Sequence, residues 1–144
     1  YNRNYWNTIT NKSTEQFYQK RSFLEPAIKT SLITACKDIS NGGILGTLYQ
    51  MLEYNEYGAE INVENIEKLL NVDKFPYSLK EFLFLFLTSA FLVTYPSNHD
   101  EKLENLVKKA KMRFYPLGTI TKLPQIIIKY QNNSKILIDK NSSL

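Results

Sequence analysis

The stretch Asp38-Ile39-Ser40-Asn41-Gly42-Gly43 decides the fold, because it joins two segments of different hydrophobic periodicity. Before it, residues 32–38 (LITACKD) are short and partly β-branched, which is typical of a buried strand. After it, apolar residues recur on one helical face, at Ile44, Leu45, Leu48, Met51 and Leu52. We therefore predict a strand, a tight turn with two glycines and an amphipathic helix in direct succession.

The predicted turn has the chemistry of an anion site. The first N–H groups of a helix lack intrahelical partners and carry partial positive charge, and glycines let the backbone approach a phosphate closely. Asp38 is a candidate to hold Mg²⁺ or to accept from a substrate hydroxyl, and Ser40 and Asn41 are candidates to donate to a phosphate oxygen. In the structural alternative, Ser40 or Asn41 caps the helix, and Gly42 and Gly43 only permit the turn. Spacing alone slightly favours the structural alternative, since the pattern is neither a Walker loop nor a Rossmann fingerprint.

Helical and strand patterns alternate on both sides of this turn. Residues 1–12 are interpreted as an N-terminal arm, Ser13 with Gln16 as a capping box, Pro26 as a break near the end of the first helix, and Gly58 as a helix C-cap. Further predicted strands cover residues 59–63, 90–95 (fully buried), 114–121, 126–130 and 135–138, and further helices cover 65–70, 78–87 and 100–111, the last capped by Ser97 or Asn98. The alternation predicts one layered α/β domain over residues 13–140, with a mixed sheet.

Composition limits the classes of partner. A formal net charge of +4 over 144 residues does not demand a nucleic-acid or membrane partner. The apolar run at residues 82–95 is too short to span a bilayer as a helix. The polar N-terminus has no signal-peptide pattern, so we expect a cytoplasmic protein. The chain begins at Tyr1 rather than at Met, which leaves open that it is a fragment.

Two single residues with reactive side chains are interpreted as structural. Cys36 is the only cysteine, which excludes an internal disulfide, and we expect it to be a small buried hydrophobe in its strand. His99 is the only histidine, and we expect it to lie solvated near the start of a helix rather than to act as a base.

Several segments together resemble the C-terminal domain of the AIR synthase (aminoimidazole ribonucleotide synthetase) superfamily. The resemblance runs from about Thr14 to Asp139, and its centre is an Asp-x-Ser/Thr-x-Gly-Gly turn followed by a helix and a Gly-Ala-Glu-Ile strand. The matching stretches are residues 34–47 (TACKDISNGGILGT), 51–53 (MLE), 58–61 (GAEI), 89–94 (SAFLVT) and 115–120 (YPLGTI). Within the superfamily, residues 6–8 (WNT) and 37–41 (KDISN) are most similar to proteins of the methanogenesis-marker-2 kind.

The resemblance implies a fold, a cofactor and partners. The fold would be a three-layer α/β/α arrangement that is partly ferredoxin-like. Superfamily members use Mg-ATP in a cleft between this domain and an N-terminal domain, which also dimerises and supplies most Mg²⁺-binding carboxylates. By that analogy Asp38, Ser40, Asn41, Gly42 and Gly43 would face the cleft and bind nucleotide or a small-molecule substrate.

This sequence departs from the family pattern at two points. Kinase-type members carry a second acid where Asn41 stands, which weakens the case for metal binding by the turn. The N-terminal domain is absent from this chain, and phosphoryl transfer depends on positioning and on metal-neutralised charge. We therefore expect the isolated chain to be inactive and the full-length protein to be an ATP-dependent kinase or synthetase that forms a homodimer.

An alternative is a non-catalytic interaction module that binds RNA or protein through exposed aromatic residues. Residues 113–116 (RFYP) do not match the stacking motif of RNA-recognition domains, because Pro116 stands where a strand should continue. The sequence therefore favours the enzyme half over the interaction module.

Overall fold

The computed structural model of this chain describes residues 13–141, with gaps at 74–75, 86 and 88. The predicted arm at residues 1–12 lies outside the described residues. The elements, in chain order, are α1 (Thr14–Arg21), α2 (Leu24–Lys29), β1 (Ala35–Asp38), α3 (Gly43–Leu52), β2 (Gly58–Asn62), α4 (Val63–Asp73), α5 (Leu79–Leu83), β3 (Phe91–Thr94), the 3-10 turn η1 (Ser97–His99), α6 (Asp100–Lys109), β4 (Gly118–Thr121), β5 (Gln125–Tyr130) and β6 (Asn133–Asp139).

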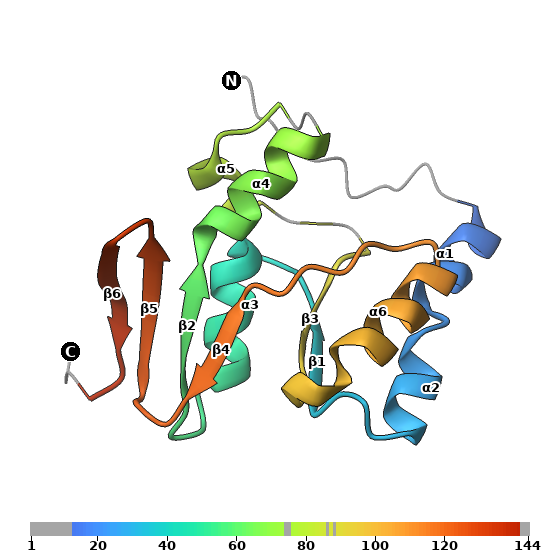
Figure 1. Cartoon of the computed structure of the whole chain (residues 1–144), viewed down its shortest axis with the longest axis horizontal. Coiled ribbons are helices and arrows are strands. Elements are labelled where there is room, and N and C mark those ends of the chain that lie inside the picture. The colour runs from blue at the N-terminus through green and yellow to red at the C-terminus, as the bar shows by residue number, and fades with distance from the viewer. Residues whose placement is uncertain (1–12, 74–75, 86, 88, 142–144) are drawn as a thin grey trace.

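The described strands form two separate sheets. The larger is a mixed sheet of order β4-β2-β5-β6, in which β2 runs parallel to β5 and antiparallel to β4. The smaller pairs β1 with β3 antiparallel, from Ala35 opposite Thr94 to Asp38 opposite Phe91. Figure 1 shows α3 between the two sheets and α1, α2 and α6 on the far side of the smaller one. The predicted α/β class with a mixed sheet is confirmed. The division of the strands into two sheets was not predicted from the sequence.

Two apolar cores account for this layering. The first lies between the mixed sheet and helices α3, α4 and α5, and includes the fully buried Ile66 and Ile126. The second joins α2 and α6 to the smaller sheet and includes the fully buried Leu103. Alternate residues of β3 contribute to different cores: Leu92 packs on the first, and Phe91 and Val93 pack on the second. β3 therefore contributes to both cores, one on each of its faces.

The first helix begins as its sequence predicts. Ser13 and Gln16 form a capping box, with the Gln16 N–H donating to Ser13 Oγ at 3.3 Å. The predicted break at Pro26 is wrong in position, because the chain leaves the helix at Ser22 and Phe23, ahead of the proline. Pro26 lies in the first turn of α2, where a missing N–H costs no intrahelical bond.

Two predictions about strands and one about a helix end are corrected. The strand at 32–38 was predicted to be buried, but β1 begins at Ala35 and three of its four residues are exposed. The strand at 90–95 was predicted to be fully buried, and β3 is half-buried along its length. Both differences have one cause: these strands form a two-stranded sheet, so each has an edge with no neighbouring strand in the described part. Gly58 does not cap a helix but begins β2, where a side chain would strike the backbone carbonyls of Leu123 and Gln125.

Helix boundaries differ more modestly. The helix predicted at 78–87 ends at Leu83, and the one predicted at 65–70 extends over Val63–Asp73. The predicted cap at Ser97 or Asn98 is wrong, because both residues belong to η1 and α6 begins after His99 without a side-chain cap. Among the described residues, no helix is long and apolar enough to cross a membrane.

Candidate functional site

The backbone of the turn after β1 requires its two glycines. Gly42 is the N-cap residue of α3 with φ of 86°, and Gly43 has φ of 64°. Both values lie in the left-handed region that residues other than glycine rarely adopt. A Cβ on Gly43 would also collide with the backbone of Leu83 and Phe84, which pack against it. The glycines therefore have the structural role that the sequence left open, and that role is compatible with ligand binding.

Backbone hydrogen bonds hold the turn in shape. The Gly43 N–H donates to the Ser40 carbonyl at 2.9 Å, and the Ser40 N–H donates to Thr47 Oγ1 at 3.2 Å. The structural alternative in which Ser40 or Asn41 caps α3 is excluded, because Gly42 occupies the N-cap and no side chain caps the helix. Within the described part of the chain, the side chains of Ser40 and Asn41 make no hydrogen bond, so both retain their donors.

One side of the turn, called its open side below, is exposed to solvent, and the other side is buried against the protein. Asp38, Asn41 and Gly42 are exposed, whereas Ile39 and Gly43 are buried against the protein. At the start of α3, the N–H groups of Ile44 and Leu45 have no acceptor among the described residues, as the first turn of a helix dictates. The turn thus combines exposed polar side chains with a helix N-terminus.

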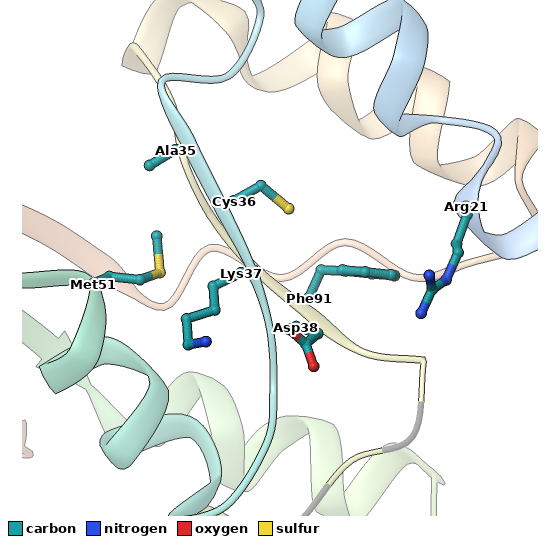
Figure 2. Close-up of a pocket in the computed structure, with 7 residues that line it drawn as sticks. All are labelled: Arg21, Ala35, Cys36, Lys37, Asp38, Met51 and Phe91. Atoms are coloured by element: carbon teal, nitrogen blue, oxygen red, sulfur yellow. The ribbon is translucent and has the colours of Figure 1, made fainter.

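Asp38 also lines a groove of about 650 Å³ that runs along β1. The four consecutive strand residues 35–38 all contribute to it, together with Arg21, Met51 and Phe91. In Figure 2, Cys36, Asp38 and Phe91 extend to the side of β1 where Arg21 lies, and Lys37 and Met51 lie on the other side. The groove exists because β1 is an edge strand whose outer side faces no strand in the described residues.

Arg21 is the residue of this groove that sequence reasoning missed. It ends α1, far from the turn in sequence, and its guanidinium lies 4.0 Å from the centre of the Phe17 ring and 5.7 Å from that of Phe91. No local motif marks it, because only the packing of α1 beside β3 brings it near Asp38. Lysine or arginine at a helix C-terminus is ordinary and carries no functional signal.

The groove offers few ligands for a metal. The described residues contain no group of three or more His, Cys, Asp and Glu side chains that could surround a metal ion. Asp38 is the one carboxylate that lines this groove. Mg²⁺ prefers several oxygen ligands, so Asp38 would need carboxylates from elsewhere, or water and substrate phosphates, to hold it.

The prediction that Cys36 is buried is wrong. Its thiol is exposed and lines the groove, because β1 is an edge strand. Neighbouring atoms nevertheless remove part of its water, and this desolvation, helped by the negative charge of Asp38, raises the pKa of the thiol above its ordinary value. A raised pKa disfavours the thiolate, so Cys36 is a weak nucleophile.

Contrary to the expectation that it is solvated, His99 is half-buried. The half-buried His99 ring places Nδ1 3.3 Å from the Leu32 carbonyl, a contact that needs a proton on Nδ1. A second cavity of about 1120 Å³ borders the buried side of the turn, because Ile39 and Ile44 line it together with residues of β2, β3, β4 and residues 111–117; residues 38 and 40–43 do not line it.

The chain belongs to the family described as AIR synthase related protein, C-terminal domain, which matches residues 9–131. It is similar to the uncharacterized protein MJ0640 of Methanocaldococcus jannaschii, with 24% identity over 93% of this chain and 40% of that protein. It is also similar to the phosphoribosylformylglycinamidine synthase subunit PurL of Thermoplasma volcanium, with 29% identity over 83% of this chain and 15% of PurL.

Solved structures share the fold at low sequence identity. PurLQS of Thermotoga maritima matches 86% of this chain and 21% of its own, with a TM-score of 0.70 and 13% identity. The hydrogenase maturation protein HypE in complex with ATP matches 82% of this chain and 39% of its own, with a TM-score of 0.62 and 10% identity. The chain thus spans well under half the length of these relatives, and its fold is that of their AIR synthase-type C-terminal domain.

Proposed function

We propose that this chain forms the C-terminal half of the active site of an ATP-dependent enzyme of the AIR synthase superfamily. In this proposal the open side of the turn faces a cleft completed by an N-terminal domain, and it binds phosphate groups of Mg-ATP or of a small-molecule substrate. Family membership supports the proposal, as does the ATP complex of HypE, a protein that shares this fold. The full-length protein would be a homodimeric kinase or synthetase.

The observation that carries this proposal is the start of α3. Two backbone N–H groups, at the buried residues Ile44 and Leu45, lack acceptors in the described residues. Two glycines in the left-handed conformation precede them, the exposed Gly42 and the buried Gly43. Anions bind at such helix starts because the free N–H groups and the helix dipole both favour negative charge. The Ser40 hydroxyl and the Asn41 amide add two further donors beside them.

The same residues define what this half-site lacks. Asp38 is a lone carboxylate in its groove, and Asn41 is neutral, so most of the charge that neutralises Mg²⁺ would come from the partner domain. Phosphoryl transfer relies on metal ions and positioned charge to stabilise the transition state. The isolated chain is therefore expected to bind nucleotide weakly and to turn over none.

An NMR titration of the ¹⁵N-labelled chain with Mg-ATP tests the proposal. We expect saturable shifts of the amides of residues 40–45, and no such shifts with adenosine, which lacks phosphates. The variant Ser40→Ala should weaken the response, whereas Ser134→Ala, at an exposed serine of the β5–β6 hairpin, should not. Absence of shifts at millimolar Mg-ATP, or an equal response to adenosine, would remove the support for a phosphate-facing turn and favour the interaction-module alternative.

A further inference from the structure

The groove along β1 is lined by an arginine that comes from a distant part of the sequence. Arg21 reaches it from α1, and Asp38 is the one carboxylate among its lining residues. Lys37 also lines the groove, but on the opposite side of β1 (Figure 2). Figure 2 shows Arg21 and Asp38 on the same side of the strand, with Phe91 between them in this view. Asp38 and Phe91 are paired across β1 and β3, so their side chains share one face of the small sheet.

Aromatic contacts hold Arg21 in place. Phe17 lies one helical turn before Arg21, and its ring centre is 4.0 Å from the guanidinium carbon. Phe91 approaches the same group at 5.7 Å, and its ring is held edge-to-face by the buried Phe23 with centres 5.7 Å apart. A guanidinium stacked on an aromatic face is restricted in orientation and keeps its N–H groups available at the edge.

Arg21 has no carboxylate partner in the described part of the chain. The ion pairs found there join Lys29 to Glu25, Lys108 to Glu104 and Lys129 to Glu60. Asp38 forms no ion pair with Arg21 although both line the same groove. An oriented, exposed and unpaired guanidinium beside a hydrogen-bond acceptor is suited to a ligand that carries an oxyanion next to a donor group.

We propose that this groove is a second ligand site, adjacent to the α3 turn and sharing Asp38 with it, that binds a small hydroxylated or amino-bearing oxyanion. Arg21 makes a two-pronged contact with the phosphate or carboxylate of the ligand, and Asp38 accepts a hydrogen bond from its hydroxyl or amino group. The inference rests on the proposed function in one respect: the ligand is the second substrate rather than ATP. Arg21 is then a substrate-binding residue supplied by α1.

Two probes distinguish the sources of the oxyanion. Glycerol 3-phosphate carries a phosphate with hydroxyls, and glycerate carries a carboxylate with hydroxyls. Each is titrated separately into the ¹⁵N-labelled chain, and the signals followed are the Arg21 side-chain Nε–H and the amides of Cys36 and Phe91. We expect saturable shifts with at least one probe at millimolar concentration, and the stronger response identifies the oxyanion. No response to either probe overturns the inference.

Three variants test the role of Arg21. Arg21→Gln should weaken binding about tenfold or more, as expected for loss of a charge-assisted hydrogen bond. Arg21→Lys keeps the charge but loses the planar fork, so it should recover only part of the affinity. Lys29→Gln is the matched control, because it removes one positive charge at an exposed position of α2. Equal binding by Arg21→Gln and Lys29→Gln would overturn the proposal.

The same variants separate this site from the phosphate-binding turn. Arg21→Gln should still show the Mg-ATP shifts at residues 40–45 if the turn binds phosphate independently. Probe shifts confined to residues 42–45 would contradict the Arg21 site and leave the proposed function intact. If the parent chain shows no Mg-ATP shifts but the probes bind at Arg21, the phosphate-binding role of the turn is contradicted. The groove would then be an oxyanion site without the proposed function.

Discussion

The backbone N–H of Ser40 donates a 3.2 Å hydrogen bond to the hydroxyl of Thr47, the one buried polar side chain in the described core. This bond joins the turn to the second turn of the helix that follows it. Because Thr47 is fully buried, its hydroxyl has no access to water as an alternative partner. The shape of the candidate phosphate-binding turn therefore depends on a residue that would never contact the ligand.

Thr47→Val tests that dependence. Valine keeps the shape of threonine but leaves the Ser40 N–H without its acceptor, so we expect a loss of about 1–3 kcal/mol in the free energy of unfolding. Urea denaturation measures it. Thr119→Val, at an exposed threonine of β4, is the control and should change stability by less than about 0.5 kcal/mol. Equal stability of the two variants would show that the Ser40–Thr47 bond does not hold the turn.

Gly43→Ala should destabilise the chain strongly. The residue has a positive φ, and a new Cβ would strike backbone atoms of Leu83 and Phe84, which cannot rotate away. Combining backbone strain with overpacking, we expect a loss of about 3 kcal/mol or more. Asn41→Ala, at an exposed neighbour without side-chain hydrogen bonds in the described residues, should be nearly neutral. A mild effect of Gly43→Ala in thermal melts would contradict the close packing of α5 on the turn.

Alkylation of Cys36 reports on its neighbour Asp38. Desolvation, and then the charge of Asp38, raise the pKa of the thiol, so iodoacetamide should modify it slowly at neutral pH. Asp38→Asn removes the charge, lowers the thiol pKa toward its ordinary value and should speed the reaction. Mass spectrometry follows the single cysteine without interference. Glu53→Gln, outside the groove, is the matched control, and identical rates for the two variants would contradict the effect of the Asp38 charge on the Cys36 thiol.

The raised pKa of Tyr95 leads us to expect that the protein loses stability at alkaline pH. Desolvation, and then its hydrogen bond and charge interaction with Asp100, raise the pKa of the phenol above its ordinary value of 10.0. Because the folded-state pKa is the higher one, the protein keeps this contribution below about pH 10 and loses it as the pH rises toward the folded pKa. Urea denaturation on either side of pH 10 should show the decrease.

Two variants show whether Tyr95 causes the decrease in stability at alkaline pH. Tyr95→Phe removes the titrating hydroxyl, so its stability should fall less steeply with pH than that of the parent chain. Tyr54→Phe makes the same change at a side chain that is 93% exposed and serves as the control. An alkaline decrease that is the same in Tyr95→Phe and in the parent would exclude Tyr95 as its source.

Sequence alone predicted the features that depend on a few neighbouring residues. The Ser13–Gln16 capping box, the two glycines after β1 and the neighbouring strands predicted at 126–130 and 135–138 are each formed by residues close together in the chain. Their geometry follows from local hydrogen bonding and allowed backbone angles. The family resemblance was likewise readable because its turn, helix and strand motifs are contiguous, and family membership was confirmed over residues 9–131.

Tertiary structure decided everything that required distant segments to meet. The exposure of Cys36 follows from the pairing of β1 with β3 alone, and the role of Gly58 follows from the close approach of residues 123–125. The groove that unites Arg21 with Asp38 exists only because α1 packs beside β3. A residue's own sequence neighbours fix its backbone preferences, but the partners that bury, expose or charge its side chain come from the packing of the whole chain, which local patterns do not encode.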